Sequence, residues 1–286
     1  MRILITGSSG QLGKTLQTQL SDHVLALVDL PKVDITKRKQ VFNKVDSFRP
    51  ELIIHCAAYT DVDGCVHNPN LAYLVNGLGT QNVALACERV GAEMVHISSN
   101  EVFAGDRRQG YEEWMPLSPL NVYGRSKAAG EIHVRNILRR FYIVRTAWLY
   151  APGGHNFIHS ILQKSQQIGQ LRVVVDEIGN PTYSADLANA IAGLIETHQY
   201  GTYHLVNEGA CSRFDFAMEI LRLGGVRGTD VSPILSTQYA RASTPPPFAA
   251  LNNIAGAAIG ITLRPWQEAL AAYVDQHLRP LGNTSS

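Results

Sequence analysis

Residues 2–13 read R-I-L-I-T-G-S-S-G-Q-L-G, a short apolar run that leads into three glycines with the spacing GxxGxxG. Gly7 allows a tight turn, Gly10 lets the backbone approach a pyrophosphate, and Gly13 lets the next helix pack closely on the strand. The N-terminus of that helix offers free N–H groups and partial positive charge to phosphate groups. The stretch therefore predicts a strand, a phosphate-binding loop and a helix, with a glycine turn that holds no ligand as the alternative.

Apolar runs of about five residues alternate with segments of helical spacing through the first half of the chain. Such runs are typical of a parallel sheet covered by helices on both faces. We therefore predict an α/β fold with a doubly wound parallel sheet, of the Rossmann type. The predicted strands are Arg2–Thr6, Val24–Val28, Leu52–Ala57, Met94–Ser98 and Phe141–Thr146, and the predicted helices are Leu12–Leu20, Lys37–Phe48, Leu71–Val90 and Ala128–Leu138.

The pattern changes after residue 150. We assign residues 1–150 to an NAD(P)-binding Rossmann domain and residues 151–286 mainly to a smaller, interleaved substrate-binding lobe, with the segments around 184–206 returning to the Rossmann domain. Ser184 is the expected N-cap of a helix, and we expect Gly282–Ser286 to be disordered. Beyond residue 150 we predict helices at Phe157–Ile168, Ser184–Thr197, Ser212–Leu223 and Pro265–Leu278, and strands at Arg172–Val175 and Tyr203–Val206.

The composition of the chain argues against several classes of protein. The chain has 286 residues with 25 Lys and Arg against 24 Asp and Glu. A net charge of +1 argues against a nucleic-acid binder and against a polybasic membrane-surface protein. No apolar run reaches the roughly 18–20 residues that span a bilayer. The 4 cysteines match no zinc or CxxC pattern, so we expect reduced thiols in a cytoplasmic protein and predict no metal site.

An acidic residue follows the second predicted strand. Asp29 lies 22 residues after Gly7, about the spacing of the carboxylate that binds the adenosine ribose hydroxyl. Asp29 favours NAD, whereas Lys32 could meet the 2′-phosphate of NADP, so both cofactors stay open. Asp34 and Ile35 are expected near the adenine.

Residues 123–127, Y-G-R-S-K, place a tyrosine four residues before a lysine. On a helix Tyr123 and Lys127 share a face, and an ammonium near a phenol lowers the pKa of the phenol. Such a tyrosine can exchange a proton with a carbonyl oxygen. Ser99, at the carboxyl end of a predicted strand, could donate to the same oxygen. The alternatives are a packing tyrosine and a turn serine.

Together these motifs resemble the dTDP-4-dehydrorhamnose reductase family of the extended short-chain dehydrogenases/reductases. The resemblance covers nearly the whole chain. It includes H-C-A-A-Y-T-D-V-D at 55–63, P-L-N-V-Y-G-R-S-K at 119–127, R-T-A-W-L-Y at 145–150 and G-N-P-T at 179–182. The resemblance implies NAD(P)H-dependent reduction of the 4-keto group of a nucleotide-linked 6-deoxy sugar, namely dTDP-4-dehydro-L-rhamnose to dTDP-L-rhamnose. Homodimers are common in this family.

The resemblance also implies roles for individual residues. Tyr123 would be the proton donor and Lys127 its partner, which also holds the nicotinamide ribose. Ser99 would be the third catalytic hydroxyl, and Asn100 and Trp148 would join it in contacting the sugar nucleotide. The residues expected along the cofactor are Gly10, Gln11 and Leu12 at the phosphates, and Ala57, Ala58 and Tyr59 after the third strand.

Two stretches depart from the family pattern. The family has Asp-Tyr after the catalytic hydroxyl, where this chain has Asn100-Glu101, and the C-terminal R-P-x-x-S-x-L is changed over Thr244–Leu251. The sister 4,6-dehydratases have Asp-Glu where this chain has Asn100-Glu101, and they use the two carboxyl groups as acid and base. The amide of Asn100 cannot donate a proton as a carboxylic acid does. Two alternatives stay open. One is a nucleotide-sugar epimerase or dehydratase, and the other is a non-catalytic regulatory subunit that resembles the methionine adenosyltransferase beta subunit.

Overall fold

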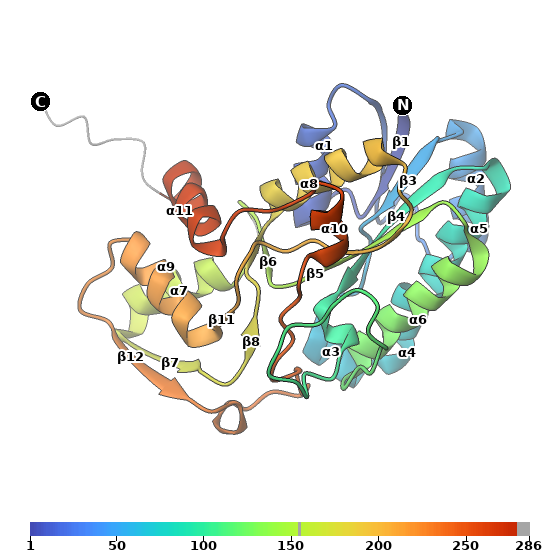
Figure 1. The fold of residues 1–286 in the computed structure, drawn as a ribbon. Helices are drawn as coiled ribbons and strands as arrows, with labels where there is room; N and C mark the ends of the chain where they lie inside the picture. Colours follow the sequence, from blue (N-terminus) through green and yellow to red (C-terminus); the bar gives the residue numbers. More distant parts are fainter. Residues whose placement is uncertain (154–155, 279–286) are drawn as a thin grey trace, which may run out of the picture.

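A six-stranded parallel sheet forms the centre of the computed structural model, which describes residues 1–153 and 156–278 (Figure 1). The strand order is β10-β5-β4-β3-β1-β2. The α/β, doubly wound fold predicted from the apolar runs is confirmed. The strands are β1 (Arg2–Thr6), β2 (Val24–Val28), β3 (Leu52–His55), β4 (Glu93–Ser99), β5 (Phe141–Thr146) and β10 (Gly201–His204). The disorder predicted for Gly282–Ser286 lies outside the described residues.

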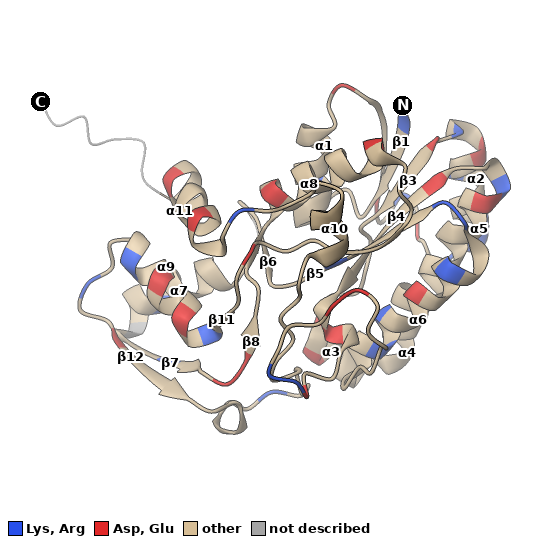
Figure 2. Cartoon of the chain, viewed as in Figure 1, with Lys and Arg blue, Asp and Glu red and all other residues tan. Residues whose placement is uncertain are grey.

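Helices cover both faces of this sheet because successive strand residues point to opposite sides. Ile3 and Ile5 of β1 pack toward α1 (Gln11–Gln19) and α8 (Ser184–Thr197). Leu4, between them, packs on the other face with α2 (Arg38–Phe48), α5 (Thr80–Val90) and α6 (Val122–Ile137). Figure 2 shows acidic and basic residues close together along the outer helices α2, α5 and α6, as expected for solvated faces.

Three elements near the site differ from the prediction. The helical stretch predicted over 71–90 consists of α4 (Pro69–Ala72), a π-helix, η1 (Tyr73–Gly79), and α5, and it is preceded by an unpredicted helix, α3 (Val62–His67). Strand β3 ends two residues earlier than predicted, at His55. Helix α6 begins at Val122 rather than Ala128, because the Asn121 side chain accepts a hydrogen bond from the Gly124 N–H at 2.8 Å and caps the helix.

The predicted N-cap of α8 is wrong. Tyr183 occupies the cap position and Ser184 is the first residue of the helix. The Ser184 hydroxyl instead accepts a hydrogen bond from Thr15 Oγ1 of α1 at 3.1 Å. The Ser184 side chain therefore links α8 to α1 on one face of the sheet and does not cap α8.

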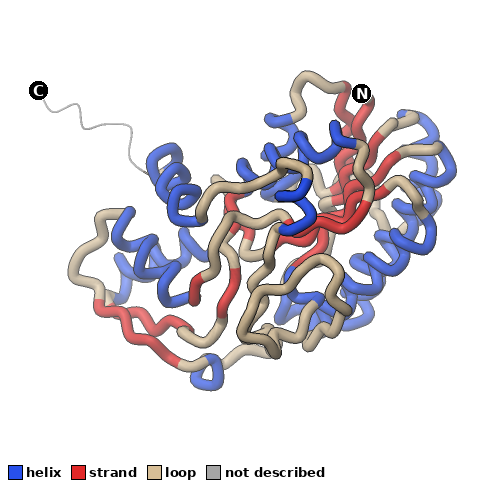
Figure 3. Tube along the Cα trace, viewed as in Figure 1, coloured by secondary structure: helices blue, strands red, loops and turns tan. Residues whose placement is uncertain are grey.

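A smaller group of elements packs beside the sheet around a second aromatic core. Tyr150, Phe216, Trp266 and Tyr273 are buried there, and Figure 3 shows the strands of this part separate from the main sheet. Its strands β7 (Gln170–Val174) and β12 (Asp230–Ile234) pair in parallel. The remaining elements are η2 (Asn100–Val102), β6 (Leu149–Tyr150), α7 (Phe157–Ile168), β8 (Ile178–Gly179), β9 (Thr182–Tyr183), β11 (Cys211–Ser212), α9 (Arg213–Leu223), η3 (Ser236–Gln238), α10 (Ile254–Ala258) and α11 (Trp266–His277).

Strand β10 lies at the edge of the main sheet, paired in parallel with β5. After β5 the chain forms part of the smaller lobe. It then returns to the main sheet with α8 and β10, and the residues after β10 form the remainder of the smaller lobe. The division into a cofactor-binding part before residue 150 and a substrate-binding part after it stays a prediction. Across the described ranges, no helix is both long and apolar enough to span a bilayer.

Candidate active site

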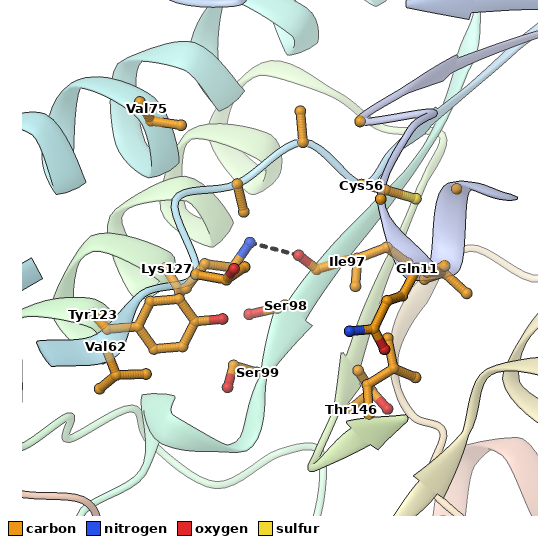
Figure 4. Close-up of a pocket in the computed structure, with 18 of the residues that line it drawn as sticks. Gln11, Cys56, Val62, Val75, Ile97, Ser98, Ser99, Tyr123, Lys127 and Thr146 are labelled. Atoms are coloured by element: carbon orange, nitrogen blue, oxygen red, sulfur yellow. Dashed lines mark hydrogen bonds between the residues drawn. The ribbon is translucent and has the colours of Figure 1, made fainter. Parts of the chain in front are cut away.

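A cavity of about 580 Å³ opens at the carboxyl ends of the parallel strands. Gly7 follows β1, Ala57 follows β3, Ser99 ends β4 and Thr146 ends β5, and all four residues line the cavity. This is the edge at which doubly wound sheets bind their ligands. Figure 4 shows Tyr123, Lys127 and Ser99 close together at this cavity.

Two glycines of the loop, Gly7 and Gly13, leave no room for a side chain. Gly7 has a φ of +66°, and a Cβ on it would lie 2.6 Å from the Ala57 nitrogen. A Cβ on Gly13 would overlap the Gly7 carbonyl oxygen. Gly10 precedes α1 and provides no side-chain cap, and the first N–H groups of a helix have no partner within the helix itself. A backbone cradle that a Cβ would fill, at a helix N-terminus, fits the pyrophosphate of a dinucleotide.

Asp29 lies where the spacing placed it, at the end of β2 and in the cavity wall. Its carboxylate accepts hydrogen bonds from the backbone N–H groups of Ser9 and Leu30, each at 2.8 Å. The carboxylate is thereby fixed beside the glycine loop.

Lys127 is almost completely buried, with 2% of its surface exposed. Its ammonium donates a hydrogen bond to the Ile97 carbonyl oxygen of β4 at 2.6 Å (Figure 4). Burial lowers the pKa of Lys127 to about 8, although the Glu131 carboxylate partly opposes this change. The amine is therefore charged at neutral pH but loses its proton more readily than an exposed lysine.

The pKa of Tyr123 changes in the direction opposite to the one predicted from Lys127. Burial raises this pKa above its usual range, the Glu101 carboxylate raises it further, and a hydrogen bond with Ser99 lowers it. Lys127 directs its ammonium to a backbone carbonyl. The phenol is therefore held in its protonated form at neutral pH.

Asn100 and Glu101, where the chain departs from the family pattern, both line the cavity and both are held by neighbours. The Asn100 amide donates to the Ala249 carbonyl oxygen at 3.1 Å, and the Glu101 carboxylate accepts from the Asn121 amide at 2.6 Å. Burial raises the pKa of Glu101. The position that would need a carboxylic acid for elimination therefore carries an amide that is bonded to the loop at Ala249.

A buried ion pair supports α6 behind the site. Glu131, one turn after Lys127, lies against Arg145 of β5, with 0% and 1% of their side chains exposed. The Ser98 hydroxyl donates to the same carboxylate at 2.6 Å. These contacts tie the helix that carries Tyr123 and Lys127 to strands β4 and β5.

A second cavity, of about 740 Å³, adjoins the first and extends into the smaller lobe. Trp148, Leu149 and Arg213 line both cavities. Trp148 has a φ of +43°, a conformation that a bulky residue adopts only when its surroundings hold it there. A ligand that spans the two cavities would pass Trp148 and Arg213.

Nearly all of the predicted site residues come together around the first cavity. Tyr59 is the exception: Asn76 holds its backbone N–H and carbonyl at 2.8 and 3.0 Å, and its hydroxyl lies beside Gly64. The predicted residues that do line this cavity are Gly7, Gly10, Gln11, Leu12, Gly13, Asp29, Asp34, Ile35, Ala57, Ala58, Ser99, Asn100, Tyr123, Lys127 and Trp148.

Sequence reasoning missed the charged residues between the lobes. Arg213 of α9 and Arg241 both approach Glu177, at 3.9 and 3.4 Å. Arg241 also approaches Asp63 of α3 at 3.6 Å. These residues come from separate elements and form no motif in the sequence. Within the ranges described, no group of three or more His, Cys, Asp or Glu could hold a metal ion.

Comparisons with known proteins show the family of this chain. A family model described as the RmlD substrate binding domain matches residues 1–279. The spore coat polysaccharide biosynthesis protein SpsK of Bacillus subtilis is 37% identical over 277 residues, covering 96% of this chain and 97% of that protein.

Two solved structures share both the sequence pattern and the fold. A dTDP-4-dehydrorhamnose reductase from Clostridium acetobutylicum is 37% identical with a TM-score of 0.94, covering 96% of this chain and 99% of that one. A dTDP-4-dehydrorhamnose reductase from Bacillus anthracis, in complex with NADP, is 40% identical with a TM-score of 0.93 and the same coverage. The chain therefore belongs to the RmlD substrate binding domain family, the family of the dTDP-4-dehydrorhamnose reductases, as its motifs predicted.

Proposed function

We propose that this protein reduces the 4-keto group of dTDP-4-dehydro-L-rhamnose to give dTDP-L-rhamnose, with NADPH or NADH as the hydride donor. The observation that carries the proposal is the shared cavity: Tyr123, Ser99 and Lys127 line the same space as the glycine loop. A proton donor, a second hydroxyl and a dinucleotide cradle in one cavity are the parts that carbonyl reduction needs.

The cofactor part of the proposal rests on the loop at Gly7–Gly13. When bound, the dinucleotide supplies the hydride. Gly10, Gln11 and Leu12 would follow its phosphates, Asp34 and Ile35 would lie near the adenine, and Ala57 and Ala58 would line its far side. The Bacillus anthracis relative binds NADP, while the fixed Asp29 carboxylate suits an unphosphorylated ribose, so we propose that either form is used.

The chain's own residues would complete the reaction at the keto oxygen. Tyr123 donates its proton to that oxygen, and the Ser99 hydroxyl donates a hydrogen bond to it. Burial keeps Tyr123 protonated, which suits a residue that acts as an acid. Lys127 holds its ammonium near this site and would bind the nicotinamide ribose. Such preorganised donors act where charge develops and need no rearrangement during the reaction.

The nucleotide sugar would occupy the second cavity and place its keto group in the first. Trp148 lies between the two cavities, and Asn100 lies beside Ser99. In this arrangement residues 1–150 bind mainly the cofactor and the smaller lobe binds mainly the nucleotide. A homodimer and a cytoplasmic location stay predictions.

Two other functions are less well supported. A 4,6-dehydratase would need an acid where Asn100 donates to the Ala249 carbonyl. A regulatory subunit would not need Tyr123, Ser99 and Lys127 gathered at one cavity beside a dinucleotide cradle.

The test is cofactor oxidation. Purified protein with dTDP-4-dehydro-L-rhamnose should consume NADPH or NADH in stoichiometric amounts. Tyr123→Phe should lower kcat by about 10²–10⁴-fold while NADPH binding is retained. Near-normal turnover in this variant would reject the role of Tyr123. Turnover without added cofactor would favour the epimerase or dehydratase.

A further inference from the structure

Arg213 occupies the junction between the two cavities. It is the first residue of α9, lines both cavities, and has 25% of its side chain exposed. A third, smaller cavity, lined by Asn100 and Glu101 among others, also includes Arg213. Anything that extends from the space beside Tyr123 into the smaller lobe must therefore pass this guanidinium.

The guanidinium is held against an aromatic surface. Its carbon atom lies 3.5 Å from the centre of the Trp148 ring and 5.3 Å from that of Phe157. The Trp148 indole also packs closely against Gly179, because a Cβ on Gly179 would lie 2.6 Å from the indole. Stacking on Trp148 fixes the plane of the guanidinium and leaves its N–H groups at the edge.

No carboxylate among the described residues comes within hydrogen-bond distance of those N–H groups. Over residues 1–153 and 156–278, the closest carboxylate is that of Glu177, 3.9 Å from Nε, which is too far for a hydrogen bond. Glu177 is also shared with Arg241. Burial lowers the pKa of Arg213 to about 10, so the group stays charged at neutral pH. The Arg213 guanidinium is thus held in place, positively charged, and not hydrogen-bonded to a carboxylate of the described residues. Such a group is suited to a phosphate or carboxylate ligand.

The second cavity has an excess of positive charge. Four cations line it, Lys164, Arg172, Arg213 and Arg241, against two carboxylates, Asp63 and Glu177. This balance favours an anionic ligand.

We propose that Arg213 anchors the diphosphate of the nucleotide sugar and thereby sets the distance between the nucleotide and the keto group. The inference rests on the proposed function, because the keto sugar must reach Tyr123 in one cavity while the nucleoside lies in the other. The diphosphate then crosses the junction at Arg213. A sugar attached to a nucleoside monophosphate lacks one of the two groups that such a fork binds.

Binding of two product fragments tests this role without catalysis. Calorimetric titration of the full chain with dTDP and with dTMP should show tighter binding of dTDP. Arg213→Met should weaken dTDP binding about tenfold or more, weaken dTMP binding much less, and leave NADPH affinity unchanged. Arg222→Met is the matched control, because Arg222 is an exposed cation on the same helix, paired with Glu219. It should leave both nucleotide affinities as in the unmodified protein.

Two results would overturn the proposal. One is an unchanged dTDP affinity in Arg213→Met, and the other is an equal loss of affinity for both nucleotides, which would indicate that Arg213 only supports Trp148. If Arg213→Met does not fold, as judged by lost NADPH binding, Arg213→Gln is read in the same way. Failure of the proposed function would appear differently, as dTDP binding without NADPH oxidation on the keto sugar.

Discussion

The buried pair behind the site gives the strongest stability prediction. In Glu131→Gln an amide replaces a carboxylate that accepts from Arg145 Nε and Nη2 at 2.9 and 2.8 Å and from Ser98 at 2.6 Å. Both side chains of the pair are almost fully buried. The variant leaves the charge of Arg145 without a counter-charge, and the amide NH₂ must face a donor.

Breaking one partner of a buried ion pair costs about 3–5 kcal/mol, a large part of the roughly 5–15 kcal/mol that stabilises a typical protein. At this chain length about 2 °C of melting temperature corresponds to 1 kcal/mol. We therefore expect Glu131→Gln to melt about 6–10 °C below the unmodified protein. Burial alone would raise the pKa of Glu131, but Arg145 lowers it below its usual value. The unmodified protein should thus keep this stabilisation until the pH falls through that lowered value.

Differential scanning calorimetry measures the change directly. Glu219→Gln is the control, because the Glu219–Arg222 pair is shorter, at 2.6 Å, but has 65% of Arg222 exposed. Exposed pairs contribute little, so this variant should melt close to the unmodified protein. A Glu131→Gln variant that melts within about 2 °C of the control would refute the reasoning that burial, rather than distance, decides the contribution.

Three further predictions concern the site. Activity should fall as the pH rises through about 8, where the buried Lys127 loses its proton, and a kcat/KM profile of Lys127→Met should lack this step. Glu101→Gln removes a carboxylate that raises the pKa of Tyr123, so tyrosinate should form at lower pH in ultraviolet titration, and Tyr123→Phe should abolish the difference. Gly13→Ala places a Cβ against the Gly7 carbonyl and should lower both stability, by about 1–3 kcal/mol, and NADPH affinity in a fluorescence titration. Gly77→Ala is its control, since a Cβ there meets only Ala129 at 3.7 Å.

The main sheet could be predicted because its strands are buried on both faces. Ile3, Leu4 and Ile5 are all buried, on alternate sides of the sheet, so the sequence shows an unbroken apolar run. The glycine loop could be predicted because its three glycines meet backbone atoms that lie close by in the fold. The apolar runs and the spacing of the three glycines can each be recognised within a short stretch of sequence.

The predicted start of α6 is too late because Gly124, in its first turn, is typical of a loop. A Cβ on Gly124 would overlap the Glu101 carbonyl oxygen, so a distant contact requires glycine at this position inside the helix. Tyr59 follows two residues that line the cavity, but its backbone N–H and carbonyl are hydrogen-bonded to the Asn76 side chain and Tyr59 does not line the cavity. Arg213, likewise, gains its position only when α9 is placed beside Trp148.

Strand β10 of the main sheet comes about 50 residues after β5 in the sequence, and this has a consequence while the chain is being synthesised. A nascent chain that ends at residue 150 would lack the strand that pairs with β5 and would expose Leu12 and Leu16, which α8 covers with Leu187 and Ile191. An open strand edge beside uncovered leucines is prone to aggregate. We therefore expect the first half of this protein not to fold on its own, so expression of residues 1–150 alone should give insoluble material until the region through His204 is included.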